Sequence, residues 1–535
     1  MGETRVHPLM RDRVAGLPPA TAELLERAAI ALDAQDLRAA EAALAGVLVL
    51  TPACAEALRM RGLVLHLCGD FSGAVALLQQ AAELQPDDAL IQMNLATSHY
   101  ANGNRDAALA GLRRGCAIEP DFAPAWYNLG KMYMLLERPV GAITALHRAL
   151  DIEPGHVPAR MLLAQAQAGL GATLPASQNY REVLRLEPDQ PSAWIGLADL
   201  DAAEFDAADV ARLQRAMQRP GADSHARICF GFALTRALED QGDFRGAFRA
   251  LRKANALMHR QLGWNALKAT ARTENMRRLF ARPLPWAKDA TLGEDVIFVV
   301  GMPQAGSLLT GQLLATHASV AIADESNELE RLIDAESTRR QQPLRRWMAT
   351  VTPAEWQRLG QDYLVRIEPL RRGKARFVDR TAGNWRRVGA IMAMLPGARV
   401  VNSRRGALET CFACYRQLFV SGHEFSYDLD HVASYWSDYD GLSRHWRRTF
   451  PTRFLDFDYE AWQTDPEPQV RRLLDFCGLE FEPACVDFHH TQRVERAASS
   501  IAAGELMRRD SLRCAAYGDQ LDRLRVLLRA RVAVD

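Results

Sequence analysis

Residues 296–317 read VIFVVGMPQAGSLLTGQLLATH and set the architecture of the second half of the chain. VIFVVG is a short apolar run rich in β-branched residues, which is typical of a buried parallel strand. Gly301 and Pro303 predict a turn after this strand, and Ser307 is the expected first residue of a helix. Gly306 would allow the backbone to approach a ligand closely. A helix that begins behind such a loop presents backbone N–H groups to an anion.

Further along, strand-like and helix-like stretches alternate. Short apolar cores predict strands within 376–380, 398–405 and 453–462, and helical patterns lie at 384–395, 407–420, 431–450 and 466–477. This order predicts an α/β domain with a parallel sheet, whose ligands bind at the carboxyl ends of the strands. The loop 302–307, Arg380 and Arg405 all follow such ends, so we expect them to form one anion-binding site. No GK[ST] follows the loop, which argues against an ATP or GTP hydrolase.

The first half of the chain repeats itself every 34 residues. The period is carried by a proline column and by a column of small residues, namely Pro52, Pro86, Pro120, Pro154 and Pro188, and Gly62, Ala96, Gly130, Ala164 and Ala198. Small residues suit the contact between two helices, and a proline suits the turn that follows a helical hairpin. One hairpin cannot bury its own apolar face, so the repeats predict an all-α solenoid. Residues 226–260 lose the period and are expected to form a capping hairpin.

This pattern resembles the tetratricopeptide repeat over about residues 20–200. Its most complete copy contains Trp126, Tyr127, Leu129, Gly130 and Tyr133. The resemblance implies a concave groove that binds a protein or peptide partner. Two other roles stay open: the repeats could hold the second half in place, or they could join two copies as a homodimer.

The second half resembles the sulfotransferases, in the bacterial branch that carries tetratricopeptide repeats and is related to protein-tyrosine sulfotransferases. The resemblance runs from residue 295 to about residue 517. Its motifs are GMPQAGSLL at 301–309, VDRTAGNW at 378–385, RRGALETCFACY at 404–415 and DYEAW at 458–462. It implies a P-loop-like α/β domain that binds the sulfate donor PAPS and needs no metal.

The resemblance also implies roles for single residues. Glu325 would be the catalytic base and Arg380 the cation near the transferring group. The donor would be bound by Pro303, Gln304, Ala305, Gly306, Ser307, Leu308, Arg405, Ala413 and Ser499. From the residues alone, Asp324 and Glu325 could instead begin a helix, where acids suit the helix dipole.

Two functions from different classes follow. The first is a PAPS-dependent sulfotransferase that acts on a hydroxyl acceptor, either protein tyrosine or a glycan. The second is an inactive scaffold of the same fold, because the loop departs from the family pattern. Gln304 stands for a cation, Ala305 and Ala413 stand for serines, and Leu308 stands for a threonine.

Composition limits the remaining possibilities. The 535 residues include 65 Lys and Arg and 65 Asp and Glu, and this balance argues against a general nucleic-acid binder. No apolar run is long enough for a membrane span, and the N-terminal residues do not resemble a secretory signal. Nine scattered cysteines favour a reducing cytoplasm, with Cys411 and Cys414 as structural thiols rather than metal ligands. The expected domains are a leader (1–20), the repeats (21–200), capping helices and a linker (201–293) and the sulfotransferase-like domain (294–535).

Overall fold

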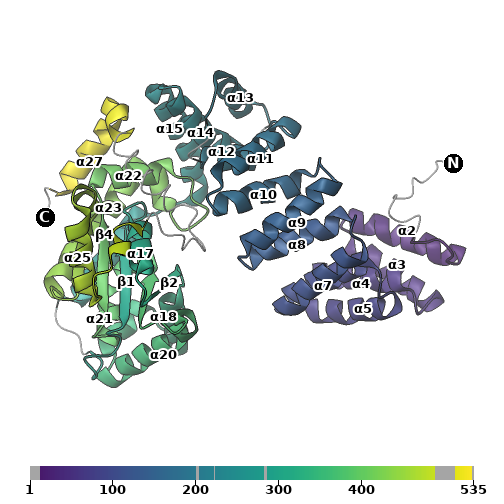
Figure 1. The fold of residues 1–535 in the computed structure, drawn as a ribbon, viewed down its shortest axis with the longest axis horizontal. Helices are drawn as coiled ribbons and strands as arrows, with labels where there is room; N and C mark the ends of the chain where they lie inside the picture. Colours follow the sequence, from purple (N-terminus) through teal and green to yellow (C-terminus); the bar gives the residue numbers. More distant parts are fainter. Residues whose placement is uncertain (1–12, 201–203, 222, 282–285, 489–512, 533–535) are drawn as a thin grey trace. The chain divides into compact units, whose positions relative to one another are not determined.

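The computed structural model describes residues 13–200, 204–221, 223–281, 286–488 and 513–532. The chain divides into two units, Met1–Pro188 and Asp189–Asp535 (Figure 1). The finer domain ranges expected from the sequence remain predictions.

The first unit is a series of antiparallel helical hairpins, as the 34-residue period predicts. Its helices are α2 Pro19–Asp33, α3 Leu37–Leu50, α4 Ala55–Leu67, α5 Phe71–Leu84, α6 Ala89–Ala101, α7 Arg105–Ile118, α8 Ala123–Leu135, α9 Pro139–Ile152, α10 Val157–Gly169 and α11 Thr173–Leu186.

The repeated residues have repeated contacts. A Cβ atom on Gly62 would lie 2.6 Å from Leu78, and one on Gly130 would lie 2.6 Å from Leu146, so these columns need small residues where paired helices touch. The side chains four positions into successive first helices each donate a hydrogen bond to the carbonyl of the preceding proline. These pairs are Gln92 with Pro86, Trp126 with Pro120, and Arg160 with Pro154.

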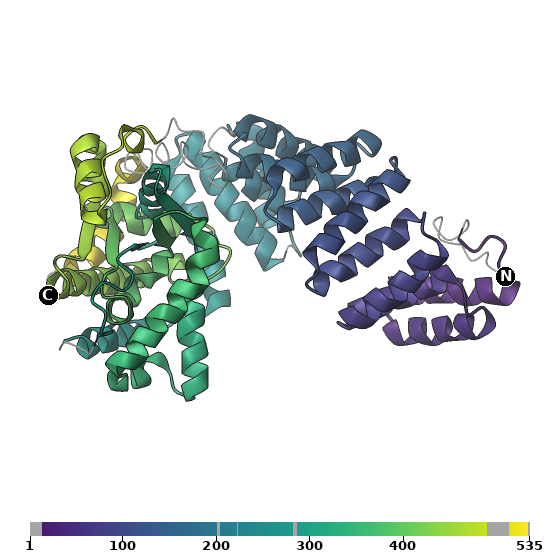
Figure 2. The same cartoon turned by 60° about the horizontal axis from the view of Figure 1, so that its bottom comes forward.

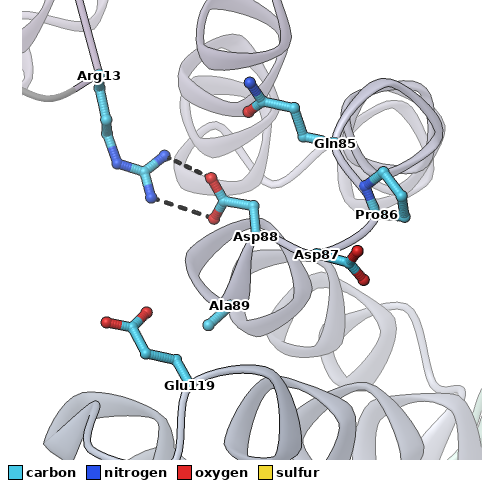
Figure 3. Close-up of a pocket in the computed structure, with 7 residues that line it drawn as sticks. All are labelled: Arg13, Gln85, Pro86, Asp87, Asp88, Ala89 and Glu119. Carbon is cyan, nitrogen blue, oxygen red and sulfur yellow. Dashed lines mark hydrogen bonds and ion pairs between the residues drawn. The ribbon is translucent and has the colours of Figure 1, made fainter.

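Arg13 reaches from outside the first hairpin into the second and third. Its guanidinium forms an ion pair with Glu56 of α4 at 2.7 Å and with Asp88, the N-cap of α6, at 3.0 Å. Figure 3 shows the guanidinium of Arg13 paired with the carboxylate of Asp88. Both residues, together with Glu119, line an open cavity of about 420 Å³.

The second unit begins with helices that precede the sheet. They are α12 Pro191–Ala198, α13 Ala207–Gln218, α14 Ser224–Asp240, α15 Phe244–Leu262 and α16 Ala266–Leu279. The hairpin expected over 226–260 is α14 and α15. Gly231 of α14 faces Ala254 of α15, and a Cβ atom on the glycine would lie 2.6 Å from the alanine Cβ.

A parallel sheet follows, with the strand order β2-β3-β1-β4-β5. The strands are β1 Val296–Gly301, β2 Val320–Asp324, β3 Arg376–Arg380, β4 Arg399–Arg404 and β5 Phe454–Asp458. Four of them lie where the sequence predicts strands. The alternative in which Asp324 and Glu325 begin a helix is wrong, because Asp324 ends β2 and the next helix begins at Glu328.

Helices cover both faces of this sheet (Figure 1). The helices described after β1 are α17 Ser307–Thr316, α18 Glu328–Arg340, α19 Leu344–Trp347, α20 Pro353–Arg371, α21 Val388–Met394, α22 Ala407–Arg416, α23 Leu429–Thr449, α24 Tyr459–Thr464, α25 Pro466–Cys477 and α27 Asp522–Val532. Ile297 and Val299 pack in a core with α17 and α25, whereas the intervening Phe298 contacts Tyr363 of α20. Figure 2 shows α18 and α20 side by side, where Arg340 forms an ion pair with Glu355.

Candidate functional site

The loop between β1 and α17 turns sharply at the carboxyl end of the central strand. A Cβ atom on Gly301 would lie 2.8 Å from the carbonyl oxygen of Ser403, so β1 and β4 can approach here only with a glycine. Gln304 and Gly306 have φ values of 65° and 98°, and these left-handed residues direct the chain into α17 at Ser307. The first N–H groups of a helix have no acceptor within it, which makes this end suitable for an anion.

The side chains of this loop are mostly enclosed. Ala305 is 2% exposed and Ser307 is buried, while Pro303, Gln304 and Leu308 are half-buried. The apolar side chains of Ala305 and Leu308 offer no hydrogen bond, so the donors that remain for an anion are backbone N–H groups and the side chains of Gln304 and Ser307.

Helix α22 is joined to the same loop by a thiol. The Sγ atom of Cys414 donates a hydrogen bond to the carbonyl oxygen of Pro303, with an S···O distance of 3.2 Å. Burial raises the pKa of Cys414 well above its ordinary value, so the thiol stays protonated and remains a donor. Ala413 precedes this residue in α22 and is buried.

Arg405 follows β4 and is 6% exposed. Its guanidinium carbon lies 5.7 Å from the ring centroid of Tyr459, a distance at which a cation and an aromatic ring attract each other. The next residue, Gly406, donates its backbone N–H to Oε1 of Glu460 at 2.9 Å. Because Gly301 pairs with Ser403, the loop 302–307 and Arg405 leave adjacent strands at the same edge of the sheet. The structure therefore brings the loop and Arg405 together, and Cys414 joins the loop to the helix that contains Ala413.

The other two predicted residues lie at the ends of β3 and β2. Arg380 is the last residue of β3, and its side chain lies against α17, since a Cβ atom on Gly311 would be 2.6 Å from its Cδ. Arg380 is in register with Asp324, and the exposed Glu325 follows with a φ of 48°. Strands lie about 4.8 Å apart, so the end of β2 is roughly 10 Å from the end of β1. Arg380, on the intervening strand, lies between Glu325 and the loop.

Asp379 organises this part of the sheet, although the sequence did not single it out. It is fully buried in β3 and accepts hydrogen bonds from three segments, at 2.8 Å from Tyr363 Oη, 3.3 Å from Ser326 Oγ and 3.0 Å from the Thr381 backbone N–H. Burial raises the pKa of Asp379, and the hydrogen bonds oppose this rise without cancelling it. Asp379 thereby fixes the residues next to Glu325 and Arg380.

Ser499, the remaining predicted donor contact, lies outside the described residues. The assignment of roles to all these side chains remains a prediction. Among the described residues, no helix combines the length and the hydropathy that a bilayer crossing requires.

Known protein families match both halves of the chain. Residues 295–483 match the sulfotransferase family. Tetratricopeptide repeat models match residues 25–89, 68–133 and 123–156.

Individual relatives are more distant. An uncharacterized protein of Aquifex aeolicus (strain VF5) is 26% identical over 355 residues. The match covers 63% of this chain and 45% of that protein, so the chain spans about half the length of this curated relative.

Solved structures align with part of the chain. A tetratricopeptide repeat protein from Parabacteroides merdae is 18% identical, with 45% of this chain and 94% of that chain covered and a TM-score of 0.32. A thermophilic tetratricopeptide repeat protein of Thermus thermophilus is 22% identical, with 34% and 98% covered and a TM-score of 0.27. The chain therefore combines tetratricopeptide repeats with a domain of the sulfotransferase family.

Proposed function

We propose that the chain is a PAPS-dependent sulfotransferase that transfers a sulfuryl group to an acceptor hydroxyl, on protein tyrosine or on a glycan. The observation that carries this proposal is the arrangement at the ends of β1 and β4. There the loop 302–307 and Arg405 follow the carboxyl ends of two adjacent strands, and Cys414 links the loop to α22. A donor with two phosphate-bearing ends requires two such anion contacts on one surface.

Each residue then has a chemical role. The loop 302–307 would hold the phosphosulfate end of PAPS and Arg405 its 3′-phosphate. The acceptor oxygen attacks sulfur, the bond between sulfur and the phosphate oxygen breaks, and PAP leaves. Glu325 takes the hydroxyl proton, and Arg380 neutralises the negative charge that develops on the leaving phosphate. The exposed position of Glu325 leaves room for a large acceptor.

The repeats would present the acceptor, or a partner that carries it, to this domain. Self-association of two copies through the repeats is the other role that we retain. The nine cysteines are all free, and eight of them are buried, which supports a cytoplasmic location.

An inactive scaffold is the second candidate, and the loop itself favours it. Ala305, Leu308 and Ala413 provide no side-chain hydrogen bond where the family pattern has hydroxyl groups. Each charge-assisted hydrogen bond is worth about 1.5–3 kcal/mol, so losing several around a dianion would weaken binding severely.

Calorimetric titration of the full chain with PAP, the desulfated product, tests the proposal. We expect micromolar binding, and Arg405→Ala should weaken it about tenfold to a hundredfold, as expected for one charge-assisted contact. Arg399→Ala is the matched control, because Arg399 lies at the opposite end of the same strand and should leave binding unchanged. No binding at millimolar PAP would support the scaffold instead.

The catalytic role of Glu325 needs a separate measurement. Glu325→Gln should keep PAP affinity and lower sulfuryl transfer about a hundredfold or more, since general base catalysis contributes at least that much. Transfer at the wild-type rate would remove Glu325 from the mechanism while leaving the donor site intact.

A further inference from the structure

Helix α15 is basic, whereas the chain as a whole has no net charge. Its sequence, FRGAFRALRKANALMHRQL, contains no aspartate or glutamate, although acids and bases are equal in number over the whole protein. The basic residues exposed on it are Arg245, Arg249, Arg252, Lys253 and Arg260, which we call the basic face.

These five residues lie on one side of the helix. At 100° per residue they fall within an arc of about 100°, and the opposite side contains the buried residues Ala247, Leu251 and Ala254. Arg245 and Arg260 are 15 residues apart, so the basic face extends for about 22 Å along the helix axis. Arg245, Arg249, Arg252 and Lys253 follow one another closely along this side of the helix, and Arg260 lies seven residues, about 10 Å, beyond Lys253.

Neighbouring side chains leave most of this charge uncompensated. Arg245 lies 3.5 Å from a carboxylate oxygen of Asp519. Within the part of the chain that the structure describes, no carboxylate comes within ion-pair distance of Arg249, Arg252 or Lys253. Like charges four residues apart on a helix repel each other, so an anionic partner would reduce the electrostatic repulsion between these cations.

The basic face rests on a rigid support. Nδ2 of Asn255 donates a hydrogen bond to the backbone carbonyl of Tyr415 at 3.0 Å, and the ring of Phe248 lies 6.5 Å from the ring of Tyr415. Both contacts attach α15 to α22 within the second unit. A partner bound on the basic face would meet cations whose helix is already ordered.

We propose that the basic face of α15 is a docking surface for an acidic segment of a partner protein, bound in an extended conformation. Cations four residues apart on a helix are about 5–6 Å apart, and alternate side chains of an extended chain are about 6.6–6.8 Å apart. Acidic residues at every second position would therefore face Arg245, Arg249 and Lys253 in turn, because these three residues are four apart. Arginine, four of the five residues, binds carboxylates with two parallel hydrogen bonds.

The composition of the basic face argues against other polyanions. Ala256 is the exposed residue between the cations, so the face has no large apolar group to enter a bilayer and no aromatic ring to stack on a nucleobase. This inference does not depend on sulfuryl transfer.

Fluorescence anisotropy with the full chain at low salt tests the proposal. The probes are two labelled peptides of identical composition, one with alternating glutamate and serine and one with the glutamates in a block. We expect the alternating peptide to bind about threefold or more tightly. The charge reversal Arg249→Glu/Arg252→Glu/Lys253→Glu should weaken its binding about tenfold, as expected for three exposed ion pairs. The matched control Arg38→Glu/Arg345→Glu/Arg346→Glu changes the net charge equally, at other exposed sites, and should change binding less than twofold.

Three results would overturn the proposal. Equal affinity for the two peptides would mean that only bulk charge is recognised. An equal loss in the control variant would mean that α15 is not the site. Binding of phosphatidylserine vesicles or of a single-stranded oligonucleotide, lost on the α15 reversal while neither peptide binds, would assign the face to a lipid or nucleic acid.

Discussion

Removing one hydroxyl group from Tyr363 tests whether Asp379 organises the candidate site. Tyr363→Phe deletes the 2.8 Å hydrogen bond to the buried Asp379 carboxylate and leaves the ring in place. A hydrogen bond to a charged group is worth about 1.5–3 kcal/mol, and the carboxylate retains only its bonds from Ser326 and Thr381. We therefore expect the free energy of unfolding of the second unit to fall by about 2–3 kcal/mol.

A second buried tyrosine provides the control. The hydroxyl of Tyr439 donates to Oδ1 of Asn402 at 2.9 Å and to the carbonyl of Ser403 at 3.2 Å, both of which are neutral acceptors. Tyr439→Phe should cost about 1 kcal/mol. Urea denaturation, followed by tryptophan fluorescence, measures the stability of both variants. The variants are compared only if the unfolding free energy depends on urea concentration with the same slope as in the wild type.

The pH dependence makes the comparison sharper. The folded pKa of Asp379 is raised by burial, so the ionised carboxylate destabilises the fold as pH rises, and losing a hydrogen bond raises this pKa further. The penalty of Tyr363→Phe should therefore shrink as the pH is lowered toward 4, whereas that of Tyr439→Phe should not change. A larger loss for Tyr439→Phe, or a Tyr363→Phe penalty independent of pH, would refute the reasoning.

Two other carboxylates yield further predictions. Hydrogen bonding and charge from three arginines, of which Arg339 contributes most, lower the pKa of Glu336 to about 2. The ionised carboxylate stabilises the fold fully above pH 4.5, and this stabilisation is lost as the pH falls toward 2. The urea midpoint of Glu336→Gln should therefore fall less on acidification than that of the wild type. Identical pH profiles for the two proteins would contradict this. Glu239 accepts two hydrogen bonds from Arg416 and one from Tyr517 in a buried site, so Glu239→Gln should lower the unfolding free energy by about 3–5 kcal/mol. Glu274→Gln removes only exposed ion pairs and should lower the unfolding free energy by about 1 kcal/mol or less in the same urea denaturation assay. Similar losses for the two variants would count against the buried network.

The parts of the fold that sequence predicts well are those with repeated or local signals. The glycine and proline columns predict the hairpins because each repeat presents the same contact again. The loop 301–307 was predictable because glycines and the adjacent apolar run act over a few residues.

Strand β2 and the role of Asp379 were not predicted, because their sequence signals are either very short or depend on residues far away in the chain. Strand β2 contains only VAIAD, which is too short for a clear alternation and is followed by acids that suit a helix start. Asp379 reads like any aspartate beside an arginine, because its partners Tyr363 and Ser326 lie 16 and 53 residues away. Only folding shows that its carboxylate is enclosed.

Arg13 has a consequence for how the repeats come apart. In a stack of hairpins each unit is stabilised mainly by the one beside it, so unfolding can begin at a free end and proceed one unit at a time. Arg13 precedes the first hairpin yet binds Glu56 and Asp88 in the second and third. The end of the stack is thus tied to units beyond its immediate neighbour, and fraying of the first hairpin alone must also break these pairs. Fraying of the first hairpin is therefore opposed by contacts that lie beyond its immediate neighbour.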